Sequence, residues 1–127
     1  MLRSPCVNVQ LELTARLAFK VPFTIVLDET ADMVMVAHNI ERFLAHESCG
    51  QCTPCRQGSY WHERILERGL SGGGTSEDLA ALERAGENIT GKVICALGDT
   101  VGVVTRALMK KFPEDFQAKF PAERRRG

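Results

Sequence analysis

The sequence lacks three features, and each absence removes a broad class of function. No apolar run approaches the roughly 18 residues that a helix needs to cross a bilayer. Sixteen basic and sixteen acidic residues give a formal net charge of zero, which offers no attraction to nucleic acid or to an anionic membrane. No dinucleotide fingerprint is present, and the triglycine at 72–74 has neither a preceding strand nor the Lys-Ser/Thr of a phosphate loop. We therefore expect no membrane span, no nucleic-acid surface and no nucleotide site.

Cysteine is scarce, but it is clustered. The chain has five cysteines, and Cys49, Cys52 and Cys55 follow a CxxCxxC spacing. An odd number of cysteines without a convincing signal peptide favours a reducing compartment and ligand thiols over disulfides. Three neighbouring thiolates suit an iron-sulfur cubane, which needs four soft sulfur ligands. Cys95, in a glycine-flanked turn before a helical pattern, is the candidate for the fourth ligand, whereas Cys6 lies in an unrelated N-terminal segment and is expected to be inert.

Hydrophobic periodicity predicts a mainly helical chain. Apolar residues recur at intervals of three and four residues, which is the spacing of one buried helix face. The predicted helices cover about 31–46, 53–69, 75–91, 98–112 and 113–120. On the first helix, the residues expected on the buried face are Met33, Val36, Ala37, Ile40, Phe43 and Leu44.

Capping residues predict where these helices begin. The polar run Asp28-Glu29-Thr30 is expected to start the first helix. Thr53 is expected to cap the second, with Pro54 in the first helical position, where no hydrogen-bond donor is lost. The third is expected to start at Thr75 or Ser76, followed by acidic residues that suit its positive end.

Helix lengths explain how Cys95 can reach the other three cysteines. A helix of about 16 residues extends roughly 24 Å, and a second of about 14 residues returns a similar distance. The hairpin brings Cys95 back beside Cys55, so we predict an up-down-up-down four-helix bundle with the iron-sulfur cluster at one end. Alternation over 7–14 and the run 22–27 predict a short β-rich N-terminal segment in front of it.

Two motifs carry a resemblance to a known family. The runs ESCGQCTPCRQG and ICALGD, with the helical stretch between them, resemble the C-terminal iron-sulfur domain of the NADH-binding flavoprotein subunit of respiratory NADH:quinone oxidoreductase. The same domain occurs in related NAD-linked hydrogenases and formate dehydrogenases. In that family the matching cysteines bind one 4Fe-4S cluster that takes electrons from a nearby flavin. The resemblance therefore implies Cys49, Cys52, Cys55 and Cys95 as cluster ligands.

The resemblance covers roughly residues 28–120, which we expect to form the helical 4Fe-4S-binding domain. Residues 1–27 form an N-terminal extension of uncertain structure, and 121–127 form a basic tail. Family members carry NADH-binding and flavin-binding domains upstream, and we expect neither site in this chain. The implied partners are flavin- and NAD-binding subunits of an NADH-oxidising complex. The implied location is cytoplasmic, peripheral to the inner membrane through that complex.

The preferred hypothesis is an electron-transfer module that relays single electrons within an NADH dehydrogenase-like or hydrogenase-like oxidoreductase. Such a module is one part of an enzyme and is not a complete NADH dehydrogenase alone. The alternatives are a non-redox partner-binding module held together by the cluster or by zinc, and a truncated gene fragment. Structural zinc sites usually pair their ligands as two separate CxxC units. Three closely spaced cysteines and one distant cysteine fit a cubane better than such a zinc site.

Several neighbouring residues have both a functional and a structural interpretation. A Rieske-type centre would need His46 or His62 in place of a cysteine, and with four thiols present we expect surface or packing roles for both, as for His38. Arg56 is expected to add positive charge beside the cluster. Tyr60 and Trp61, next to the cysteines, could shield the cluster or face a partner, but we expect them to pack in the core.

Two glycines beside the cysteines also have two interpretations. Gly50 and Gly58 either allow close backbone approach to the cluster or serve a turn and helix packing.

Overall fold

The computed structural model describes residues 27–28 and 30–122, and this part of the chain contains helices and turns but no strand. The prediction of a mainly helical protein is confirmed. The predicted β-rich segment lies outside the described residues, except for its last residue. None of the described helices has the length and apolar character to cross a membrane. The helices are α2 (Met33–Glu47), α3 (Thr53–Leu70), α4 (Ser76–Ile89), α5 (Ala96–Lys111) and α6 (Pro113–Lys119).

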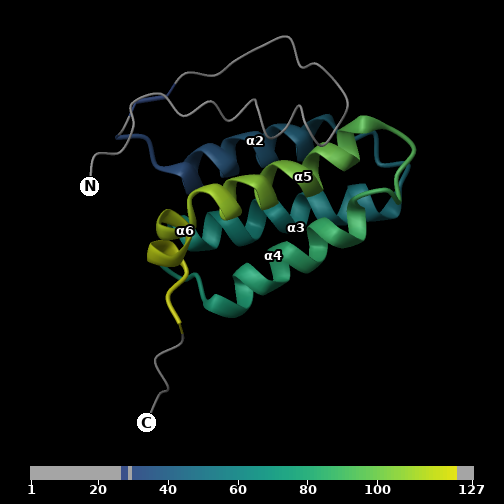
Figure 1. Cartoon of the computed structure of the whole chain (residues 1–127). Helices are drawn as coiled ribbons and strands as arrows, with labels where there is room; N and C mark the ends of the chain where they lie inside the picture. The colour runs from purple at the N-terminus through teal and green to yellow at the C-terminus, as the bar shows by residue number, and fades with distance from the viewer. Residues whose placement is uncertain (1–26, 29, 123–127) are drawn as a thin grey trace.

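The helices α2, α3, α4 and α5 lie alongside one another, and each runs opposite to the one before it (Figure 1). α2 packs against α3 and α5, and α4 packs against the same two helices. The short α6 contacts α2 and α5 at one end of the molecule. This order brings the α2–α3 loop and the α4–α5 loop together at the opposite end, although a whole helical hairpin separates them in the sequence (Figure 1).

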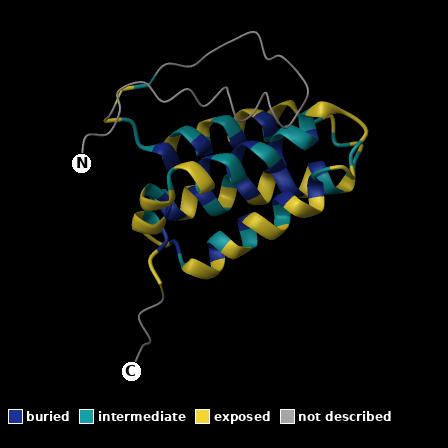
Figure 2. Cartoon of the chain, in the orientation of Figure 1, coloured by how far each residue is buried: buried dark blue, intermediate teal, exposed yellow. Residues whose placement is uncertain are grey.

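Each described helix carries buried residues, which are coloured dark blue in Figure 2. They form two hydrophobic clusters of different size. The small cluster contains Leu44, Ile89 and Val101. The large cluster contains Met33, Val34, Ala37, Leu66, Leu82, Val104, Leu108, Phe116 and Phe120.

The first helix begins later than the polar run predicted. Asp32 is the N-cap of α2, because its carboxylate accepts hydrogen bonds from the backbone N–H groups of Val34 (2.9 Å) and Met35 (3.2 Å). The Asp28 carboxylate instead accepts from the N–H (3.0 Å) and the hydroxyl (2.7 Å) of Thr30. Asp28 therefore stabilises a turn before the helix and does not cap the helix. An aspartate side chain can make either kind of hydrogen bond to nearby backbone.

Three aromatic residues expected in the core are exposed instead. Phe43 is 61 % exposed, Tyr60 52 % and Trp61 56 %. On α2 the buried face includes Glu41, a charged residue that a search for apolar periodicity passes over. On α3 the buried face near the cysteines consists of small and polar residues, which leaves the aromatic positions outside.

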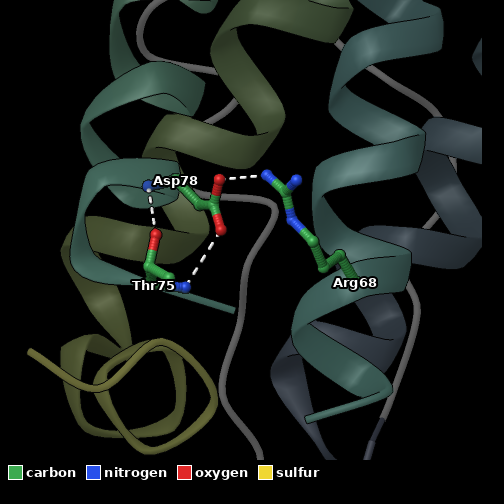
Figure 3. Close-up of polar contacts among 3 residues, drawn as sticks. All are labelled: Arg68, Thr75 and Asp78. Atoms are coloured by element: carbon green, nitrogen blue, oxygen red, sulfur yellow. Dashed lines mark hydrogen bonds and ion pairs between the residues drawn. The ribbon is translucent and has the colours of Figure 1, made fainter. Parts of the chain in front are cut away.

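α4 begins at Ser76, as the sequence predicted, and a capping box fixes this start. The Thr75 hydroxyl accepts from the Asp78 backbone N–H (3.3 Å), and the Asp78 carboxylate accepts from the Thr75 N–H (3.0 Å). The same carboxylate pairs with the guanidinium of Arg68 near the end of α3 (Figure 3). Asp78 therefore holds the start of α4 against the end of α3.

Two aromatic residues close the end of the molecule away from the cysteines. Phe116 of α6 and Phe120 just after it are each 1 % exposed, and the predicted last helix folds back on α2 and α5. Phe120 lies against α3, where a Cβ atom added to Gly69 would come within 2.2 Å of the Phe120 ring. Only glycine fits at that position, because a methyl group would displace the ring.

We predict that Thr75→Ala lowers the free energy of unfolding by about 1 kcal/mol, the usual cost of losing an N-cap hydroxyl. The Asp78 N–H loses its acceptor in this variant. Thr75→Ser is the matched control, because it keeps the hydroxyl and should retain most of the stability. Chemical denaturation followed by circular dichroism measures both. Equal losses in the two variants would contradict the role given to the hydroxyl.

Candidate metal centre

Three of the predicted ligands lie where α2 passes into α3. Cys49 is exposed on the loop, Cys52 is half-buried at its end, and Cys55 is buried in the first turn of α3. The N-cap of α3 is Cys52 and not Thr53, which is already helical. The backbone of Cys52 is extended, as a capping residue requires, but its side chain makes no capping hydrogen bond. The Cys52 sulfur is thus not used by the helix.

The fourth predicted ligand occupies the same position on another helix. Cys95 is the N-cap of α5, and it is exposed. α5 begins at Ala96, slightly earlier than the expected start near residue 98. Like Cys52, Cys95 makes no side-chain capping hydrogen bond. The structure therefore places all four cysteines on the two loops, or the helix starts that follow them, at one end of the molecule (Figure 1).

The ends of α3 and α5 favour negative charge. The first backbone N–H groups of a helix have no partner within it, and the aligned peptide dipoles make this end positive. Cys52 and Cys95 each stand directly before such an end, and Cys55 lies within the first turn. An anionic group bound by these cysteines would therefore lie beside two positive helix ends.

The cysteine loop is held in shape by its own polar contacts. The Ser48 hydroxyl lies 3.4 Å from the Cys55 sulfur and also accepts from the Gly50 N–H (3.3 Å). Arg56 Nη1 donates to the Gly50 carbonyl oxygen at 2.7 Å. Gly50 has a φ of +78°, so it is a turn glycine. Ser48 was not predicted, although its place next to Cys49 offered a signal.

The second loop is held by an acidic residue of α5. Asp99 accepts a hydrogen bond from the Gly91 N–H at 2.7 Å, and Gly91 has a φ of +74°. Behind the loops, a Cβ atom on Gly58 would lie 2.4 Å from the terminal carbon of Ile89. Gly58 is therefore a packing glycine between α3 and α4. The loop contact of Asp99 depends on tertiary structure, and the sequence pattern gave no sign of it.

The donor set fits an iron-sulfur cluster. Among the residues that the structure describes, no three Cys, His, Asp or Glu side chains converge closely enough to hold a single metal ion. A 4Fe-4S cluster does not need such convergence, because its four thiolates surround a cubane of several atoms. His46 is exposed at the end of α2, and His62 is buried within α3, in line with the surface and packing roles expected of them.

An open groove of about 930 Å³ runs beside the cysteine loop, between α2 and α3. The exposed rings of Phe43 and Tyr60 line it. Arg42, His46 and Arg56 also line it, and the last of these is the residue that holds Gly50. The groove thus combines aromatic and basic side chains next to the cysteines.

Comparison with known proteins gives the class of protein and then its family. Residues 35–119 match the model of the NADH-ubiquinone oxidoreductase-F iron-sulfur binding region. This match identifies the helical fold, with its cysteines at one end, as an iron-sulfur domain. The cofactor of the domain is a 4Fe-4S cluster. The chain belongs to the family of NADH-ubiquinone oxidoreductase-F iron-sulfur binding regions, as the resemblance implied.

Similar proteins are found among respiratory and hydrogenase subunits. The chain is 41 % identical over 100 residues to the F 2 subunit of NADH-quinone oxidoreductase from Rhizobium meliloti (strain 1021), covering 79 % of this chain and 24 % of that protein. It is 37 % identical over 95 residues to the mitochondrial NADH-ubiquinone oxidoreductase 51 kDa subunit of Neurospora crassa, covering 75 % and 19 %. A crystal structure of an NAD+-reducing [NiFe]-hydrogenase in the H2-reduced state matches with a TM-score of 0.75 and 34 % identity, covering 80 % and 17 %. The chain thus spans a quarter or less of these proteins.

We predict that Arg56→Ala lowers the reduction potential of the bound cluster, because the guanidinium favours the more negative reduced state. Arg56 is exposed, so the shift should shrink as salt is added. A redox titration followed by electron paramagnetic resonance measures it.

Two control variants accompany this test. Arg56→Lys keeps the positive charge, and Arg64→Ala removes a charge paired with Glu67 farther along α3. An unchanged or raised potential in Arg56→Ala would contradict the electrostatic role.

Proposed function

We propose that Cys49, Cys52, Cys55 and Cys95 bind one 4Fe-4S cluster at the open end of an up-down-up-down four-helix bundle built from α2 to α5. One observation carries the proposal: the α3–α4 hairpin returns the chain so that two cysteine-bearing loops lie at the same end of the molecule. The family match supports the identity of the cluster. We assign the helical domain to residues 28–120, with 1–27 and 121–127 as flanking segments.

The chain's own residues would set the properties of this site. The buried Cys55 and its contact with the Ser48 hydroxyl shield one ligand from water and offer a hydrogen bond to its sulfur. Hydrogen bonds to the sulfurs and positive helix ends both favour the reduced cluster. When bound, the cluster would accept and release one electron, and the protein would supply its ligands, its burial and its orientation.

The proposed role is to relay single electrons inside a larger oxidoreductase. The support comes from the relatives, which are named as NADH-quinone and NADH-ubiquinone oxidoreductase subunits and as an NAD+-reducing hydrogenase. The partners would be flavin- and NAD-binding proteins of such a complex, peripheral to the membrane. The groove with exposed Phe43 and Tyr60 gives a partner an apolar surface close to the cysteine loop.

We predict that Cys95→Ser lowers the iron content of anaerobically purified protein by most of its wild-type value, because the cluster loses the ligand supplied by the second loop. Cys6→Ser is the matched control, since the same chemical change is made outside the proposed ligand set. Iron analysis and the visible absorption of the cluster measure both variants. Full iron content in Cys95→Ser would overturn the ligand assignment.

We also predict that the isolated chain does not transfer electrons from NADH to an artificial acceptor, because its sequence has no dinucleotide fingerprint. Dithionite should still reduce the cluster in the same preparation. The measurement is a spectrophotometric assay of NADH oxidation under anaerobic conditions. NADH oxidation by the chain alone would show that it holds a nucleotide site of its own.

A further inference from the structure

A polar triad lies in the middle of the core, away from the cysteine loops. We use this name for Glu41 of α2, His62 of α3 and Thr105 of α5, whose exposed fractions are all 0 %. The Thr105 hydroxyl donates to Glu41 Oε1 at 2.5 Å, and His62 Nδ1 lies 3.7 Å from the same oxygen. Glu41 Oε2 and both ring nitrogens of His62 have no hydrogen-bond partner in the structure.

The triad lies near the boundary between the two hydrophobic clusters, and Ile40, next to Glu41, packs against both of them. Along α2, Glu41 lies between Ala37 of the large cluster and Leu44 of the small one. Along α5, Thr105 lies between Val101 of the small cluster and Leu108 of the large one. With apolar residues on both sides, a charge at this level is screened less than in water, so its stability depends on other charges in the interior.

The charge of the triad depends on how many protons Glu41 and His62 hold together. One shared proton leaves the pair neutral overall, a second proton makes it positive, and none makes it negative. A purely structural polar contact between α2 and α5 would need only the hydroxyl of Thr105 and one acceptor. The unpartnered imidazole is not explained by such a contact, because a buried polar group normally has a hydrogen-bond partner.

The triad lies on the same helix face as a cluster ligand. His62 follows Cys55 by seven residues, which corresponds to about 10 Å along α3. Ser59, which is 1 % exposed, occupies the turn between them on the buried face of α3. The path between the ligand and the imidazole is thus protein interior, where charges are screened less than in water.

We propose that Glu41 and His62 form a buried proton-binding site that takes up one proton from solvent when the bound cluster gains one electron. This inference rests on the proposed function. The electron comes from a reduced flavin in the complex, or from dithionite in vitro, and the proton comes from water. The added positive charge at the pair offsets the added negative charge at the cysteine end. Oxidation of the cluster releases the same proton.

Other titratable side chains on the surrounding helices are more exposed than Glu41 and His62, or they are paired with partners of their own. Among the described residues, Glu41 and His62 are the only carboxyl and imidazole groups with zero exposure. Arg106, next to Thr105, lies 3.8 Å from Glu87 of α4, and the Asp78 carboxylate is paired with Arg68. Other groups on the packed helices that are buried or half-buried include His38 of α2, Cys55 and Glu63 of α3, Asp99 of α5, and Asp115 and Lys119 of α6. Asp115 has interactions of its own.

The test is the reduction potential of the cluster-loaded chain between about pH 5 and about pH 8, the range in which histidine titrates. In the wild type, the equilibrium constant for reduction should fall with rising pH, by up to about tenfold per pH unit for one proton per electron. Glu41→Gln and His62→Gln should each lose most of this dependence. Thr105→Val is the matched control, because it removes a buried hydrogen bond but no titratable group, and should keep it.

A second measurement needs no variant. Infrared difference spectra between the oxidised and reduced wild-type protein, with glutamate carbon labelled isotopically, should show a change in a carboxyl band on reduction. A reducible cluster whose potential does not vary with pH, or a Glu41→Gln variant that keeps the wild-type slope, would overturn the inference and leave the proposed function standing. A chain that binds no reducible cluster would overturn both.

Discussion

The structure depends on bringing four thiols to one place from two distant parts of the chain. Three of them need only a short loop and the first turn of α3, but Cys95 has to be returned by a complete helical hairpin. The lengths of α3 and α4 make this possible, and the close contact of Gly58 with Ile89 keeps the two helices together just behind the loops. Ser48, Arg56 and Asp99 then fix the loops themselves.

The interior is arranged in layers along the helices. The cysteine loops come first, followed by the small hydrophobic cluster, the polar triad and the large hydrophobic cluster, and the aromatic rings of Phe116 and Phe120 close the other end. The large cluster and the capping box at Thr75 stabilise the fold far from the cysteines. Burying a carboxyl group and an imidazole costs stability. The proposed proton uptake gives these two groups a use in balancing the charge of the cysteine end.

Much of the fold could be predicted because helix formation depends on local sequence. Helix periodicity, Pro54 and Thr75 located the helices, and the cysteine spacing indicated the kind of cofactor. The predictions failed where side chains compete or where distant helices meet. Asp32, and not Asp28, caps α2, and Cys52, and not Thr53, caps α3. Glu41 is buried and Phe43 is exposed. The sequence of α2 did not predict this, because the hydrogen bond of Glu41 with Thr105 depends on how α5 packs against α2.

The central claim is that one end of this helical domain binds a single iron-sulfur cubane. Its most direct test is the iron and acid-labile sulfide content of anaerobically purified protein, together with the electron paramagnetic resonance spectrum after reduction. A single 4Fe-4S cluster should give four irons and four sulfides per chain and the signal of a reduced 4Fe-4S cluster. Protein that contains no iron, or one zinc ion per chain and no signal, would contradict it.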